Sequence, residues 1–159
     1  MSLKTSPAAD PAAEYRRLQL LGVAPEVIAP LLDYVEALNA AKAQTAEQYR
    51  HLLAEDGSLA EYFQVDPAVT GAAKYLQVVQ MRPAYSHEAP GDKPSGVHSV
   101  VDKVLGTVHK SAGWKGGPAK STSKARKGQP IVAYELLNAD SFGAMLTRLD
   151  VYGGYLYSR

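Results

Sequence analysis

The sequence predicts a mainly α-helical protein, a helical bundle with one long amphipathic helix, a long basic loop and a C-terminal tail rich in Tyr and Gly. Alanine, the strongest helix former, is abundant in the chain, and isoleucine is nearly absent. The longest periodic stretches repeat their apolar residues at spacings of 3 and 4, which is the period of a helix. A length of 159 residues suits a single domain over residues 1–159.

The first helix is expected over residues 10–22. Asp10 can cap its start, and Pro11 suits the first helical position because its missing N–H has no partner there anyway. Gly22 suits the C-terminal end, where a left-handed backbone conformation is common.

The long helix is expected over residues 30–54, about 37 Å at 1.5 Å per residue. Its alanine-rich middle would let another helix approach closely. The other expected helices are shorter, so part of its apolar stripe would stay exposed on a lone subunit, as interaction surfaces do. The larger apolar residues of the stripe are Leu31, Val35, Leu38, Tyr49 and Leu52.

Two more helices are expected over residues 66–82 and 95–109. Asp66 opens the first of them, and Pro83 ends it because the residue before a proline disfavours the α conformation. The second is rich in valine, which leaves a strand open, but its spacing of 3 and 4 favours a helix.

The rest of the chain is predicted as a basic loop over residues 110–130, a helix over 140–150 and a tail over 151–159. Between the loop and the last helix, residues 131–137 (IVAYELL) fit either a strand or a buried helical turn.

Charge is distributed unevenly along the chain. Residues 1–101 carry twelve acids and eight bases (12 − 8, a balance of −4), whereas residues 102–159 carry four acids and nine bases (9 − 4, a balance of +5). Flexible cations among Gly, Ser and Pro bind phosphates through counterion release, and an exposed Trp can stack on a base. The candidate nucleic-acid-binding residues are Lys110, Trp114, Lys115, Lys120, Lys124, Arg126 and Lys127.

The loop contains GGPAKST, which resembles a phosphate loop only at first sight. Counting back from Lys120, the two glycines that such a loop requires fall on Ala119 and Trp114. The histidines and acids show no metal-ligand spacing. The sequence therefore predicts no cofactor, no metal site and no small-molecule substrate.

Ser95, His98 and Asp102 share one side of the helix expected over 95–109. That arrangement supports an alternative function, a small hydrolase or transferase in which a carboxylate orients the histidine as a base. The simpler interpretation makes Ser95 a helix cap and His98–Asp102 a surface pair, so we expect no catalytic residues.

Together these features predict a non-enzymatic structural protein that binds nucleic acid through phosphates and self-assembles, in a nucleocapsid, coat or chromatin-like role. A second alternative is an adaptor that docks its basic loop on an acidic protein surface. Tyrosines in the tail would serve as amphipathic anchors at a subunit contact. The expected assembly interface comprises Leu31, Val35, Leu38, Tyr49, Tyr152, Tyr155 and Tyr157.

The chain has no cysteine, which fits a reducing compartment. Its first residues lack the apolar core of a signal peptide, and no run reaches the length of about 20 apolar residues that a membrane helix needs. We therefore expect a protein without a membrane span, located in the cytoplasm or within a virion or nucleoprotein particle.

Overall fold

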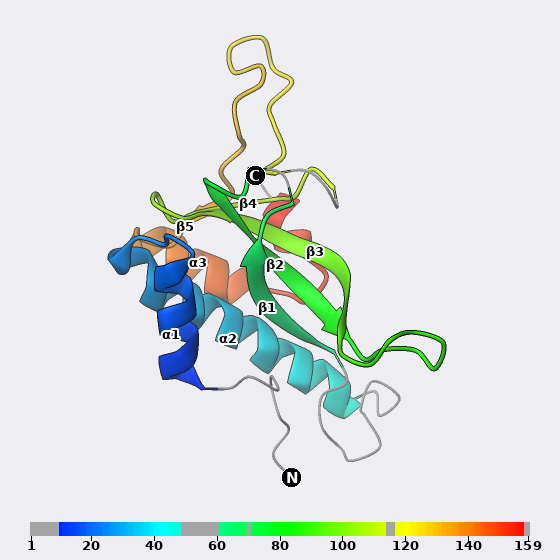
Figure 1. Cartoon of the computed structure of the whole chain (residues 1–159). Coiled ribbons are helices and arrows are strands. Elements are labelled where there is room, and N and C mark those ends of the chain that lie inside the picture. Colours follow the sequence, from blue (N-terminus) through cyan, green and yellow to red (C-terminus); the bar gives the residue numbers. More distant parts are fainter. Residues whose placement is uncertain (1–9, 49–60, 70, 114–116, 158–159) are drawn as a thin grey trace.

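The computed structural model describes residues 10–48, 61–69, 71–113 and 117–157 (Figure 1). Within these ranges the chain forms α-helices and a five-stranded antiparallel sheet, so the protein is a mixed α/β protein. The predicted mainly α-helical bundle is therefore wrong. The error lies in the middle of the chain, where two expected helices are strands.

The helices lie at the two ends of the chain. Asp10 caps α1 by accepting the N–H groups of Ala12 and Ala13, and Asn138 caps α3 by accepting that of Ser141. Among the described residues, no helix combines the length and apolar character needed to cross a membrane. The bounds are Pro11–Leu20 for α1, Pro25–Gln48 for α2, Ala139–Arg148 for α3 and Gly154–Tyr157 for the 3-10 turn η2.

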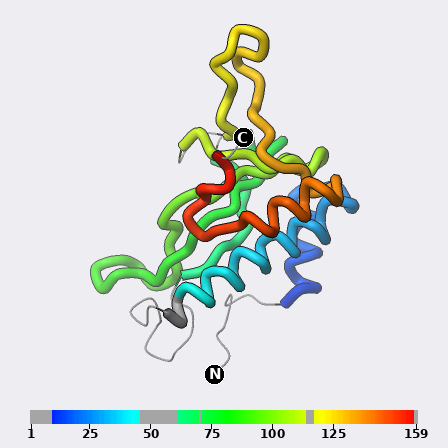
Figure 2. Tube along the Cα trace, turned by 180° about the vertical axis from the view of Figure 1, so that it is seen from behind, coloured from blue at the N-terminus to red at the C-terminus, as the bar shows by residue number. Residues whose placement is uncertain are grey.

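The sheet follows chain order, β1-β2-β3-β4-β5, with every neighbouring pair antiparallel. Seen from behind, α2 runs across the sheet, with α3 and the C-terminal turn beside it on the same side (Figure 2). The strands are β1 Tyr62–Pro67, β2 Tyr75–Arg82, β3 Lys93–Asp102, β4 Thr107–His109 and β5 Tyr134–Glu135.

The core lies between α2 and the sheet. From α2, the side chains of Leu31, Tyr34 and Leu38 are completely buried. Because these residues face the sheet of their own subunit, much of the apolar stripe of the long helix is covered within one chain. The strands contribute Phe63, Val65, Leu76, Val78, Val101 and Val108.

The helix predicted over 66–82 is replaced by a turn and a strand. Asp66 and Pro67 end β1, and β2 then pairs with β1 on one side and β3 on the other. The strand reads YLQVVQMR, in which apolar and polar residues do not alternate strictly, so periodicity alone does not distinguish it from a helix.

The helix predicted over 95–109 is replaced by most of β3, a tight turn and β4. Gly106 makes the turn with a φ of +68°, and a Cβ there would lie 3.2 Å from Leu137 Cγ. The apparent helical spacing of the valines arises because a turn separates Val100 and Val101 in β3 from Val108 in β4. Their β-branched side chains suit these strands.

Candidate functional site

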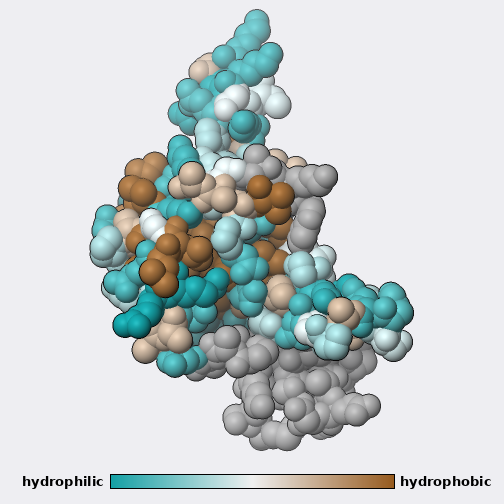
Figure 3. Space-filling view, viewed as in Figure 1, coloured by the Kyte–Doolittle hydropathy of each residue, from teal (hydrophilic) through white to brown (hydrophobic). Residues whose placement is uncertain are grey.

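The described part of the segment predicted as a basic loop pairs through two isolated β-bridges beyond β4. One bridge joins Ser111 to Pro118, and the other joins Lys120 to Pro130 at the base of a second, longer hairpin. We call residues 119–131, the second hairpin, the basic arm. It projects away from the sheet (yellow to orange in Figure 1) and is mostly hydrophilic in the space-filling view (Figure 3).

Backbone hydrogen bonds hold the two sides of the arm together. The Ser121 N–H donates to the Gln129 carbonyl at 2.8 Å, and the Gly128 N–H donates to the Ser121 carbonyl at 3.0 Å. Gly128 adopts a φ of +82° at the return from the tip, a conformation that glycine accepts without a steric cost. At its base, the Ala119 N–H donates to the Lys110 carbonyl at 2.8 Å, which joins the arm to the end of β4.

Every cation on the arm is exposed. Arg126 and Lys127 lie with Lys124 in the turn at the tip, and Lys120 lies nearer the body. Within the described part of the chain, none of these four forms an ion pair, and the arm contains no acid. Uncompensated charge on a projecting ribbon produces a positive potential well away from the body.

The remaining predicted nucleic-acid contacts have different positions. Lys110 lies at the base of the arm, half-buried, with its Nζ 4.2 Å from the centre of the Tyr157 ring. Trp114 and Lys115 lie outside the described residues. The structure thus brings four of the predicted cations together on the arm and places a fifth at its base.

Three of the seven residues of the predicted assembly interface are buried. Leu31 and Leu38 are fully buried in the core and Tyr155 is 3% exposed, so they are not available to another subunit. Tyr152 and Tyr157 are exposed, as expected of contact residues. Val35 is half-buried and packs against the core, and Tyr49 lies outside the described residues.

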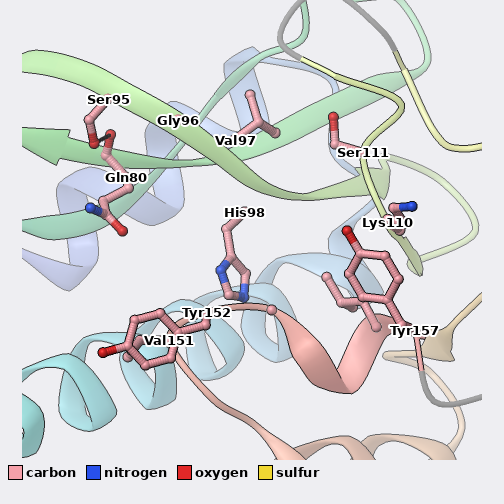
Figure 4. Close-up of a pocket in the computed structure, with 12 residues that line it drawn as sticks. Gln80, Ser95, Gly96, Val97, His98, Lys110, Ser111, Val151, Tyr152 and Tyr157 are labelled. Carbon is pink, nitrogen blue, oxygen red and sulfur yellow. Dashed lines mark hydrogen bonds between the residues drawn. The ribbon is translucent and has the colours of Figure 1, made fainter.

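A pocket of about 320 Å³ opens beside the base of the arm, between β3 and the C-terminal turn (Figure 4). We call it the β3 pocket. In Figure 4, Tyr152 and Tyr157 lie on opposite sides of the His98 ring, and Gln80 reaches in from β2. Its principal lining residues are Gln80, Ser95, His98, Lys110, Tyr152 and Tyr157.

Two irregularities in the β2–β3 pairing set the wall of this pocket. Val78 pairs with Ser99 and Val79 with Val97, which leaves His98 as an extra residue in β3. A second shift, two residues along β2, leaves Ser95 as an extra residue in the same way. Bulges of this kind redirect side chains, and both extra residues line the pocket.

His98 is fixed by a buried chain of hydroxyl groups. Its Nε2 lies 2.8 Å from the hydroxyl of Tyr155, which lies 2.7 Å from that of Tyr34, which in turn lies 2.8 Å from Ser99 Oγ. Burial lowers the pKa of His98 to about 4, although Asp150 and a backbone hydrogen bond to Val151 oppose the shift. His98 is therefore neutral at pH 7.

Burial also shifts the pKa values of the two tyrosines in this series of hydrogen-bonded hydroxyl groups. It raises the pKa of Tyr34 to about 12 and raises that of Tyr155 as well. Both hydroxyl groups stay protonated at neutral pH, so the network consists of hydrogen bonds between uncharged groups. These hydrogen bonds join α2, β3 and the C-terminal turn.

Ser95, His98 and Asp102 are not assembled into a catalytic group. They lie along β3 and not on one face of a helix, so Asp102 is about 13 Å beyond His98 at the rise of a strand. Asp102 Oδ1 accepts the N–H groups of Val104 and Leu105 and so caps the turn after β3. Ser95 Oγ donates to the Gln80 carbonyl at 3.2 Å.

The partners of His98 could not be found from sequence. Tyr155 lies 57 residues away from it, and only the two bulges and the sheet pairing bring them together. Nothing distinguishes Tyr155 from the neighbouring tail tyrosines in the sequence. No group of three or more His, Cys, Asp or Glu side chains within the described ranges is arranged to hold a metal ion.

Comparison with known proteins gives a family but no function. A family model described as a family of unknown function (DUF7717) matches residues 23–158. No curated protein and no solved structure matches the chain. The matched range includes both the basic arm and the β3 pocket and leaves out α1.

Proposed function

The chain belongs to the DUF7717 family, whose function is unknown, and we propose that it binds nucleic acid through phosphate contacts made by the basic arm. The supporting observation is the set of four exposed cations on the arm, none of them paired with an acid of the described chain. Lysine and arginine release counterions from phosphates when they bind nucleic acid, and this provides sequence-independent affinity.

The shape of the arm favours nucleic acid as its partner. A two-stranded ribbon is narrow enough to enter the major groove of a duplex or to lie along a phosphate backbone. Its cations stand among small residues at the tip, with no acidic or aromatic side chain beside them, so phosphate contacts are expected to provide most of its affinity. We therefore expect binding with little dependence on base sequence.

Self-assembly is not part of this proposal. Leu31 and Leu38, which were expected to pack against other subunits, lie in the core of a single chain, and the bundle that would have presented them does not form. The adaptor alternative uses the same arm against an acidic protein, and failure to bind the duplex tested next would favour it.

The test is binding of a fluorescent duplex at several salt concentrations. If four arm cations meet phosphates, log K should fall against log salt with a slope of about −3 to −4. Replacing Lys124, Arg126 and Lys127 together by Ala should flatten that slope by about 3. Undiminished duplex binding by this arm variant would refute the proposal.

A matched control removes three positive charges elsewhere. Arg16, Lys74 and Arg148 are exposed, lie off the arm and form no ion pair with a described residue. Their replacement by Ala changes net charge by the same amount, so it should leave the slope nearly unchanged. An equal loss in both variants would mean that net charge, and not the arm, determines binding.

A further inference from the structure

We propose that the β3 pocket holds one nucleotide of single-stranded nucleic acid, with the base against the exposed ring of Tyr157 and a phosphate at Lys110. This inference deepens the proposed function and rests on it. In this proposal the arm binds a single-stranded nucleic acid and the pocket holds one of its nucleotides. The proposal therefore predicts a preference for single-stranded nucleic acid over duplexes.

The pocket and the arm are continuous. Lys110 and Ser111 line the pocket and also begin the segment that leads into the arm, and Ala119 at the base of the arm bonds to Lys110. A phosphate backbone that follows the cations of the arm toward the body therefore reaches Lys110 at the pocket edge (Figure 4). The nucleotide attached to that phosphate then faces the opening.

Size limits the occupant to a small group. A pocket of about 320 Å³ is near the lower end of the range of about 300–1,000 Å³ seen for ligand sites. One nucleotide suits such a space. A base within a duplex could not enter without leaving its stack, which makes a single strand the better ligand.

Two exposed aromatic rings supply the surface for a base. Tyr152 is 85% exposed and Tyr157 is 64% exposed. Stacking on tyrosine accepts any base because every base has a π-face. Lys110 next to the Tyr157 ring adds a cation close to the stacking position.

The polar lining accepts an anionic ligand. The lining residues include no acid, and the adjacent Asp150 is engaged, since its Oδ1 accepts the Tyr152 N–H at 2.8 Å. His98 is held on one side by Tyr155 and on another by the backbone of Val151, so it forms a fixed, neutral wall. Gln80 also lines the pocket, and while its Nε2 donates to Glu61, its Oε1 can accept a hydrogen bond from the sugar or the base edge.

The test uses a glycine in the pocket wall. Gly96 lines the pocket, and a Cβ there meets no atom within 4 Å, so Gly96→Leu is accommodated and obstructs the site. Gly143 in α3 has the same free space, and Gly143→Leu is the matched control. Binding of a fluorescent oligothymidine and of a duplex of equal length is measured for each variant, with melting temperature as the check on folding.

We expect Gly96→Leu to weaken oligothymidine binding by about tenfold, the loss of one stacked base, while duplex binding stays unchanged. If Gly96→Leu also lowers the melting temperature, Tyr157→Ala at an exposed side chain makes the same comparison. Oligothymidine binding that is unchanged, or that falls only in parallel with duplex binding, would overturn the inference. Failure of the proposed function gives a different result, because the variant with Lys124, Arg126 and Lys127 replaced by Ala would then keep its affinity for both probes.

Discussion

The hydroxyl of Tyr155 connects two buried groups that would otherwise lack a partner at that position. It lies 2.8 Å from His98 Nε2 and 2.7 Å from the hydroxyl of Tyr34. A buried polar atom that loses its partner costs about 1–3 kcal/mol. Tyr155 therefore fixes the C-terminal turn to β3 and α2 by chemistry as well as by apolar packing.

We expect Tyr155→Phe to lower the free energy of unfolding by about 1–3 kcal/mol, because it removes one hydroxyl from two buried hydrogen bonds. Urea unfolding followed by far-UV circular dichroism measures the change. Tyr152→Phe removes a hydroxyl from a residue that is 85% exposed and should have almost no effect. Equal effects of the two substitutions would contradict the claim that the Tyr155 hydroxyl forms buried hydrogen bonds that stabilise the fold.

The low pKa of His98 makes stability depend on pH. An unfolded histidine titrates near 6.5, whereas folded His98 titrates at about 4, with Asp150 and Lys42 as the charged groups that act on it. Between these values the unfolded chain binds the proton first, so stability is fully present above about pH 6.5, falls toward pH 4 and then levels off. The loss is at most about 3 kcal/mol.

Unfolding measured from pH 7 to pH 4 tests this effect. His98→Gln should flatten part of the pH dependence, and His87→Gln at an exposed loop position should not. His109, whose pKa burial also lowers, contributes in the same direction in both variants. If the free energy of unfolding of the wild-type protein rises between pH 7 and pH 4, the predicted direction of the pH dependence is wrong.

Strands and helices differ in how far the sequence predicts them. The start of α1 follows from Asp10 and Pro11, because caps are local signals. β2 and β3 were mistaken for helices because the burial of a central strand is decided by its neighbours in the sheet, and a bulge or a turn interrupts the alternation that would reveal it. Valine content was the one local hint, and the spacing overrode it.

Asn39 links the long helix to the edge of the sheet. Its Nδ2 donates to the Phe63 carbonyl at 3.1 Å, and its Oδ1 accepts the Phe63 N–H at 2.7 Å, so one side chain replaces a missing neighbour strand for β1. Asn39→Leu should cost about 2–4 kcal/mol, because both backbone groups of Phe63 lose a buried partner.

The same helix offers a control for that prediction. Thr45 Oγ1 donates to the Ala41 carbonyl one turn earlier, a bond internal to α2, so Thr45→Ala should change stability by less than Asn39→Leu. Thermal unfolding of both variants makes the comparison. If Asn39→Leu is the milder substitution, α2 is not held to β1 through this side chain.

At the scale of the whole molecule, the sequence predicts the positive charge of the candidate site but not its three-dimensional arrangement. The absence of acids between Asp102 and Glu135 is a matter of composition. That Lys120 pairs with Pro130, and that the β3 pocket lies beside the base of the arm, depends on contacts between distant parts of the chain. Leu31 and Leu38, expected at an assembly interface, lie in the core because the sheet that covers α2 was not foreseen.

The arm should be separable from the body that carries it. Residues 122–130 are all exposed, and the buried core contains no residue of the arm. Lys120 and Pro130 face each other as bridge partners, so a short flexible Gly-Ser linker can join them in place of residues 121–129. The shortened chain should keep the melting temperature and far-UV spectrum of the full chain, because no apolar burial is lost.

Nucleic-acid binding by the shortened chain completes this prediction. Three of the four arm cations, Lys124, Arg126 and Lys127, leave with the deletion, so duplex affinity at moderate salt should fall at least as far as in the arm variant. Thermal unfolding and duplex titration of the same preparation give both readouts. A broad or lowered transition would show that the arm supports the fold, and a stable body with full affinity would move the phosphate contacts elsewhere on the protein.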